Sequence, residues 1–257
     1  LLGMLDNWHS FSKKLSENYW VIALDQRNHG KSAHHEVFDY KQLSEDLYAF
    51  MLNHQILRCH LIGHSMGGKT VMQFLNDHAA MVEKGIVVDI APKSYGGGHE
   101  KIFKALLNID IENIGSRKEV QEKLMEEIAD LGVVLFLMKN LSRNSDGSYR
   151  WKANIPVLWK NYSRIIADID IAHPVDNEVL FIKGAKSNYI SGEDADEIKL
   201  LFPNSEIASI ADAGHWGACR STGFALEKDN RFFAISNPRC LQYLVIISFK
   251  LKRSQCI

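Results

Sequence analysis

The chain has 257 residues, and 46% of them are hydrophobic, so it can bury a sizeable core as one large domain or as one domain with an insertion. Lys and Arg together number 30 against 31 Asp and Glu, which gives a formal net charge of −1 and excludes the basic footprint typical of nucleic-acid or anionic-membrane binding. We therefore expect a small, neutral or modestly charged substrate, and neither nucleic acid nor a membrane as a partner.

Cysteine usage favours a soluble protein of a reducing compartment, which we expect to be the cytoplasm. None of the four cysteines has C-x-x-C spacing, so the sequence indicates neither disulfides nor a zinc site. There is no basic and then apolar signal segment, and no apolar run is long enough to span a bilayer. A segment upstream of Leu1 could still carry a targeting signal.

Apolar, β-rich runs alternate with segments of helical period along most of the chain. Most of these runs are continuously apolar, which is typical of strands buried on both faces of a parallel sheet. The predicted fold class is α/β, with a mostly parallel sheet flanked by helices. In chain order we expect strands at 19–24, 57–62, 85–90 and 178–183, an alternating edge strand at 205–210, and helices at 40–53 and 69–75.

The alternation stops between residues 93 and 176. This stretch opens with a run of three glycines at 96–98 and then shows helical patterns at 100–107, 118–138 and 156–166, with a polar turn at 143–147. We expect an all-helical cap at 93–176, inserted into an α/β core made of residues 1–92 and 177–257. We interpret Trp151, Trp159 and Tyr162 as packing anchors of the cap in preference to substrate contacts.

The most informative feature is Gly63-His64-Ser65-Met66-Gly67, between an expected strand and an expected helix. In a G-x-S-x-G turn the glycines let the strand and the helix approach each other, and the serine is held in a strained conformation that exposes its hydroxyl. The pattern predicts that Ser65 is a nucleophile. The alternative is a serine that only caps the helix.

A serine nucleophile requires a base and an orienting acid. His215 follows the last expected strand in Ala213-Gly214-His215-Trp216, at the edge of the sheet where Ser65 also falls. We predict that His215 is the base. His64 is interpreted as structural, because its side chain should point away from that of the neighbouring Ser65.

Four motifs occur in a fixed order: DQRNHGKS at 25–32, GHSMGGK at 63–69, VVDIAP at 87–92 and GHW at 214–216. In this combination the chain resembles the α/β-hydrolase superfamily from residue 1 to about residue 216. More narrowly, it resembles the small acyl-ester hydrolase branch of YbfF-type bacterial esterases and mitochondrial abhydrolases. The resemblance strengthens the assignment of Ser65 as nucleophile and His215 as base.

The orienting acid requires a separate argument. Many α/β-hydrolases place it after the strand that follows the cap, where this chain has Ser187, which cannot remain ionised. Asp89 ends the strand next to the nucleophile strand, and the resembling branch is similar in placing its acid at this aspartate, so we predict Asp89 as the acid. The competing interpretation makes Asp89 structural and assigns the acid to Asp194 or Asp196.

The backbone N–H of Met66 should supply one donor of the oxyanion hole. In the family the second donor comes from a loop that carries a His-Gly pair, and Leu1 and Leu2 resemble the residues that follow this pair. The chain therefore looks N-terminally truncated. After Trp216 the resemblance ends, as a reading-frame change would explain, and we expect the apolar run at 241–249 to be disordered or prone to aggregation.

The predicted function is a serine hydrolase that cleaves carboxylic esters or thioesters of small to medium acyl chains, without a metal or organic cofactor. Two other chemistries fit the same motifs, those of a cofactor-free haloperoxidase and of a C–C bond hydrolase, and a third alternative is a catalytically impaired binding protein. The sequence makes no prediction of oligomeric state. Side chains expected to support the site or to bind substrate are those of Ser187, Tyr189, Trp159 and Trp216.

Overall fold

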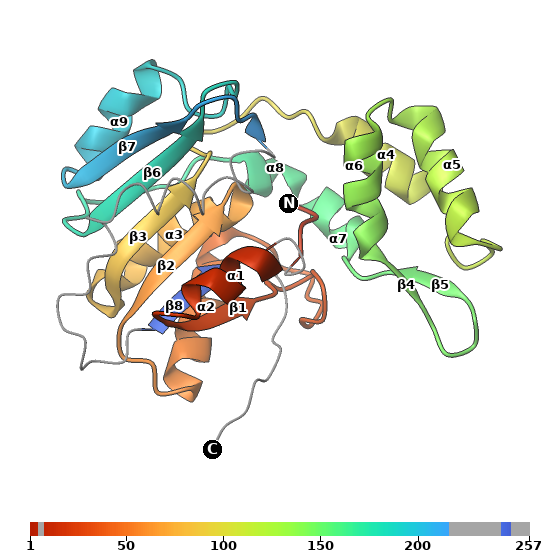
Figure 1. The fold of residues 1–257 in the computed structure, drawn as a ribbon, viewed down its shortest axis with the longest axis horizontal. Helices are drawn as coiled ribbons and strands as arrows, with labels where there is room; N and C mark the ends of the chain where they lie inside the picture. Colours follow the sequence, from red (N-terminus) through yellow and green to blue (C-terminus); the bar gives the residue numbers. More distant parts are fainter. Residues whose placement is uncertain (5–7, 216–242, 248–257) are drawn as a thin grey trace.

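The computed structural model describes residues 1–4, 8–215 and 243–247 (Figure 1). Its core is a six-stranded sheet in the order β1-β8-β2-β3-β6-β7, in which every neighbouring pair of strands is parallel. The predicted fold class is thereby confirmed, and β7 lies at one edge of the sheet as expected. The strands are β1 (Trp20–Leu24), β2 (Cys59–His64), β3 (Val82–Val88), β6 (Glu178–Gly184), β7 (Ser205–Ile210) and β8 (Tyr243–Ile247).

Two apolar clusters cover the two faces of the sheet, because successive side chains of a strand point to opposite faces. Within β6, Val179 and Phe181 belong to one cluster, and Leu180 and Ile182 belong to the other. The helices divide in the same way: α1 (His9–Leu15) covers one face, and α2 (Tyr40–Asn53), α3 (Met66–His78) and α9 (Glu193–Leu201) cover the other (Figure 1). Burial on both faces explains the continuous apolar runs.

Strand β8 comes from the C-terminal part of the chain and lies between β1 and β2. Its register places Leu244 opposite both Val21 and His60, and its three central side chains are fully buried. The expectation of disorder is therefore wrong for residues 243–247. The same β-propensity and lack of charge that favour aggregation also suit a strand buried on both faces.

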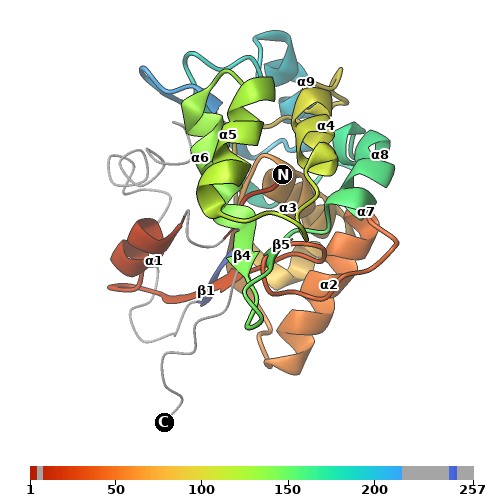
Figure 2. The ribbon, with the colours of Figure 1, turned by 90° about the vertical axis from the view of Figure 1, so that its right-hand side faces the viewer.

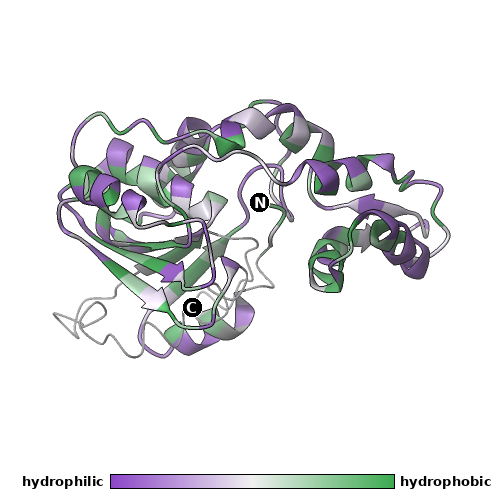
Figure 3. Ribbon diagram, turned by 90° about the horizontal axis from the view of Figure 1, so that it is seen from above, coloured by the Kyte–Doolittle hydropathy of each residue, from purple (hydrophilic) through white to green (hydrophobic). Residues whose placement is uncertain are grey.

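Residues 93–176, which we call the insertion, leave the core between β3 and β6. Helices α4 (Glu100–Asn108), α5 (Arg117–Glu127) and α6 (Leu131–Leu137) project beyond the sheet as a lobe (Figures 1 and 3), which faces the viewer in Figure 2. Helices α7 (Ile155–Lys160) and α8 (Tyr162–Ile166) return the chain to the core. The lobe is not all helical as predicted. Strands β4 (Leu141–Arg143) and β5 (Tyr149–Trp151) form an antiparallel hairpin around the polar turn.

Two helices of the insertion that we predicted as continuous are each divided in two. The Asp130 carboxylate accepts hydrogen bonds from the N–H groups of Gly132 and Val133, so α6 begins anew after α5. Asn161 separates α7 from α8, and its side-chain amide donates to the Val157 carbonyl. Because the apolar spacing continues through both breaks, hydrophobic periodicity did not separate the helices.

Short 3-10 turns lie at Ala79–Met81 and Met138–Asn140.

Val245→Asp should destabilise the protein far more than Leu57→Asp. Val245 is fully buried in β8, whereas Leu57 is 82% exposed. Leaving a carboxylate buried and unpaired costs about 3–5 kcal/mol, while a change at the surface usually costs about 0.5 kcal/mol or less. Urea midpoints of unfolding for both variants and the wild type measure the difference. Equal midpoints for the two variants would show that β8 does not lie inside the sheet.

Candidate active site

Ser65 lies on the sharp turn between β2 and α3. Its backbone angles are φ 53° and ψ −120°, a combination that L-residues rarely adopt. The turn is tight because a Cβ atom on Gly63 would lie 2.1 Å from the Gly67 carbonyl oxygen. The Ser65 N–H donates to the Val88 carbonyl at 2.9 Å, which joins the turn to the end of β3.

A hydrogen-bonded line connects Ser65, His215 and Asp89. The His215 Nδ1 atom lies 2.8 Å from Asp89 Oδ2, and His215 Nε2 lies 3.1 Å from Ser65 Oγ. An ionised carboxylate only accepts hydrogen bonds, so Nδ1 carries the proton and Nε2 of the neutral ring accepts from the Ser65 hydroxyl. The structure thus brings together the three residues that the sequence singled out, from the ends of three different strands.

The Asp89 carboxylate is completely buried and is fully engaged by donors. Besides His215, the Ser187 hydroxyl donates to Oδ2 at 2.5 Å and the Gly184 N–H donates to Oδ1 at 2.9 Å. Burial raises the pKa of Asp89, but the hydrogen bonds from His215, Ser187 and Gly184 outweigh it, and the pKa lies below the ordinary aspartate value. Asp89 therefore holds its charge wherever ordinary aspartates are ionised.

The two competing carboxylates are placed differently. Asp194 accepts from the Lys93 ammonium at 2.8 Å and from both the N–H and the hydroxyl of Ser191. Asp196 lies in the first turn of α9. The Asp89 carboxylate, by contrast, contacts the His215 ring directly.

Two other rings pack against the His215 ring. Tyr189 stacks on it at 3.8 Å between centroids with planes 15° apart, and His64 lies at 4.7 Å with planes 36° apart. Burial, and secondly repulsion from the His215 ring when it is protonated, lower the pKa of His64 to about 3. His64 is therefore neutral, and its Nε2–H donates to the His215 carbonyl at 3.1 Å. Sequence reasoning missed this contact, because it considered the direction of His64 only relative to Ser65.

Of the residues expected at the oxyanion hole, Met66 lies at the turn itself, and Leu1 and Leu2 pack in the apolar cluster that includes Met66. Met66 is the first residue of α3 and is buried, and the N-terminus of a helix favours negative charge. Leu1 is partly buried and packs against this cluster. Leu2 has φ 56°, and its carbonyl accepts from the Asn140 side chain at 2.8 Å, which ties this segment to the insertion.

The expected aromatic residues of the site do not all gather there. Trp159 is 41% exposed and packs with Phe103 and Tyr162 within the insertion, as a packing anchor would. His99 joins this cluster through the Tyr162 hydroxyl, 3.1 Å from its Nδ1 atom. Trp216 lies outside the described residues.

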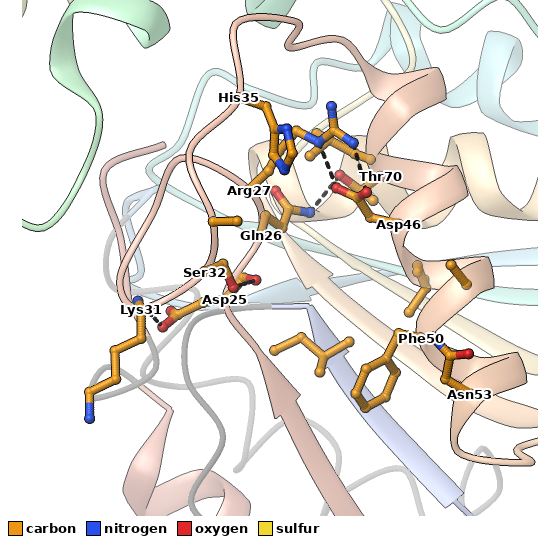
Figure 4. A pocket seen from close by; sticks show the side chains of 15 residues that line it. Asp25, Gln26, Arg27, Lys31, Ser32, His35, Asp46, Phe50, Asn53 and Thr70 are labelled. Atoms are coloured by element: carbon orange, nitrogen blue, oxygen red, sulfur yellow. Dashed lines mark hydrogen bonds and ion pairs between the residues drawn. The ribbon is translucent and has the colours of Figure 1, made fainter.

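A pocket of about 530 Å³ lies between the loop after β1 and α2 (Figure 4). Ser65, Asp89 and His215 are not among its lining residues, so it is distinct from the hydrogen-bonded line. Two hydrogen bonds of 2.6 and 2.7 Å join Arg27 to Asp46 on its wall, and Gln26 donates to the Thr70 hydroxyl at 2.7 Å. These contacts fix the loop against α2 and α3.

Residues 1–4, 8–215 and 243–247 contain neither a candidate metal site nor a candidate membrane-spanning helix. No group of three or more His, Cys, Asp or Glu side chains in these ranges could hold a metal ion. No helix in the same ranges has both the length and the apolar character needed to cross a bilayer.

Comparison with known proteins places the chain among α/β-hydrolases. The sequence model of the family described as "alpha/beta hydrolase fold" matches residues 1–218. Esterase YbfF of Escherichia coli is 34% identical over 217 residues, which are 84% of this chain and 83% of that protein. The sn-1-specific diacylglycerol lipase ABHD11 of Danio rerio is 33% identical over 225 residues, covering 84% of this chain and 70% of the lipase. A solved structure titled "Marine microorganism esterase" superposes with a TM-score of 0.87 at 39% identity, covering 90% of this chain and 92% of that one.

Gly63→Ala should destabilise the protein, whereas Gly96→Ala should not. A methyl group at residue 63 would collide with the Gly67 carbonyl, but at Gly96 it would meet no atom within 4 Å. Overpacking of a rigid site costs about 1–3 kcal/mol. Chemical denaturation of both variants measures this cost, and a Gly63→Ala protein as stable as wild type would contradict the tight turn.

Proposed function

The chain belongs to the α/β-hydrolase family, and on this premise we propose that it is a carboxylic ester hydrolase acting through Ser65, His215 and Asp89. The observation that carries the proposal is the unbroken hydrogen-bonded line from the Asp89 carboxylate through the His215 ring to the Ser65 hydroxyl. The similarity to an esterase and a lipase favours ester cleavage over the haloperoxidase and C–C hydrolase alternatives. The complete line also argues against a catalytically impaired binding protein.

Each member of the line has one role in the proposed reaction. The Ser65 oxygen attacks the carbonyl carbon of the ester or thioester while its proton moves to His215 Nε2. The His215 imidazolium then gives this proton to the departing alcohol or thiol, which leaves an acyl group on Ser65. Water, deprotonated by the same His215, attacks the acyl carbon. The bond to the Ser65 oxygen then breaks, the His215 imidazolium returns the proton to that oxygen, and the acid is released. Asp89 holds the ring in the required tautomer and stabilises its positive charge.

The oxyanion formed in each step requires hydrogen-bond donors at the turn. The Met66 N–H is one donor, and the N-terminus of α3 adds its positive potential. We assign the second donor to the backbone of Leu1 or Leu2, because this segment packs in the same apolar cluster as Met66 and is fixed by Asn140. Loss of one oxyanion donor lowers the rate about a hundred- to a thousandfold, so residues 1–2 should have a large effect on the rate of hydrolysis.

We propose residues 93–176 as the cap of the site and residues 1–92 and 177–257 as its core. The aromatic cluster of the insertion, with Trp159 partly exposed, supports an apolar surface for acyl chains of small to medium length. Ser187 and Tyr189 support the site by holding Asp89 and the His215 ring. No cofactor takes part in this scheme.

Ser65→Ala should abolish hydrolysis of p-nitrophenyl acetate without unfolding the protein. Alanine removes the hydroxyl and leaves the turn glycines in place. Ser209→Ala, a change at an exposed serine of β7, is the matched control and should retain full activity. Clear residual activity of the Ser65 variant, with an unchanged circular dichroism spectrum, would remove Ser65 as the nucleophile.

Asp89→Asn should lower kcat by about a thousand- to ten-thousandfold, because the amide favours the wrong tautomer of His215. Asp194→Asn should change kcat little, since the Asp194 carboxylate contacts Lys93 and Ser191. Steady-state kinetics of the two variants on one ester make the comparison. If the Asp194 variant were the more damaged, the acid would lie after the insertion and Asp89 would be structural.

A further inference from the structure

Lys69 is a buried cation on the helix that carries the nucleophile, and the proposed reaction does not use it. It lies one turn beyond Ser65 in α3, and only 1% of the residue is exposed. Burial lowers the pKa of its ammonium to about 8, so the group is still mostly charged at neutral pH. A buried charge is costly unless polar groups surround it, so the contacts of Lys69 need an explanation.

Two backbone carbonyls and two aromatic rings surround the Lys69 ammonium. It donates to the Lys93 carbonyl at 2.8 Å and to the Ala167 carbonyl. It also lies 4.9 Å from the centre of the Tyr95 ring and 5.7 Å from that of Tyr40, within the range of cation–π attraction.

The two carbonyls belong to the two crossings between core and insertion. Lys93 lies where the chain leaves the core, and Ala167 lies where it returns after α8. The crossings also contact each other directly: the Tyr95 N–H donates to the Ile166 carbonyl and the Ile169 N–H donates to the Pro92 carbonyl, both at 2.8 Å. Lys69 joins this pair of crossings to the nucleophile helix.

The same contacts continue to His215. The Tyr95 hydroxyl accepts from the Ala91 N–H at 2.7 Å and donates to the Tyr189 carbonyl at 2.8 Å. Tyr189 in turn stacks on the His215 ring. One cation is therefore connected both to the entry and exit of the insertion and to the residue that packs on the proposed base.

We propose that Lys69 is a positioning residue that clamps both crossings of the insertion onto the nucleophile helix and so sets where the insertion stands relative to Ser65. The expected effect on ester binding rests on the proposed function. The expected effect on the position of the insertion rests on the contacts alone. A displaced insertion should weaken the binding of long acyl chains, which reach it, more than that of acetate, because small displacements have large effects on a positioned substrate.

Lys69→Met tests the clamp, with Lys41→Met at an exposed position of α2 as the matched control. Hydrogen exchange at the Tyr95 and Ile169 amides, followed by mass spectrometry, should accelerate on the order of tenfold in Lys69→Met and not in the control. The ratio of KM for p-nitrophenyl octanoate to KM for the acetate should rise about tenfold or more. Lys69→Arg, which keeps a charged donor, should restore part of the protection.

Exchange and KM ratios equal to those of Lys41→Met would overturn the clamp. If Lys69→Met does not fold, Tyr95→Leu and Tyr95→Phe test the clamp instead. Phenylalanine keeps an aromatic ring against the Lys69 ammonium, so the Ile169 amide should exchange more slowly in Tyr95→Phe than in Tyr95→Leu. Equal exchange in these two variants would also overturn the clamp. A wild-type protein that cleaves no ester would contradict the proposed function, while the exchange data would still judge the clamp.

Discussion

The buried charge of Asp89 is the constraint on which the site depends. A carboxylate with no exposed surface is stable only when donors surround it, and here the ring of His215, the hydroxyl of Ser187 and the N–H of Gly184 fill that need. These donors fix the end of β3, the loop after β6 and the loop after β7 around one point. The His215 ring, once oriented by Asp89, has a single nitrogen left for Ser65. Ionisation, packing and the proposed catalysis thus follow from the same set of contacts.

The backbone is strained at the strand ends that carry the proposed catalytic residues, and the strands behind them are densely packed. Ser65 and Asp89 both have φ 53°, and both lie at the carboxyl ends of neighbouring parallel strands. The strands behind them are buried on both faces, so the sheet can hold these conformations. Lys69 connects the insertion to this part of the core, because it joins the helix after Ser65 to both crossings. The position of the insertion and that of the nucleophile are therefore mechanically related.

Much of this structure follows from local sequence, and what does not follow depends on distant contacts. The turn around Ser65 and the parallel core were predictable because glycine spacing and continuous apolar runs have direct geometric consequences. The β8 strand was not, since an apolar run does not reveal which strands it will join. The breaks at Asp130 and Asn161 coincide with side-chain hydrogen bonds that hydrophobic periodicity does not reveal. The contact of His64 with His215 depends on two segments far apart in the chain.

Covalent labelling measures the central claim most directly. A fluorophosphonate reacts with a serine whose hydroxyl is activated by a neighbouring base, and peptide mapping by mass spectrometry locates the adduct. The account predicts one adduct on Ser65 in the wild-type protein and a greatly slowed reaction when His215 is replaced by alanine. An adduct on another serine, or no adduct on the folded protein, would contradict the proposed hydrolase mechanism.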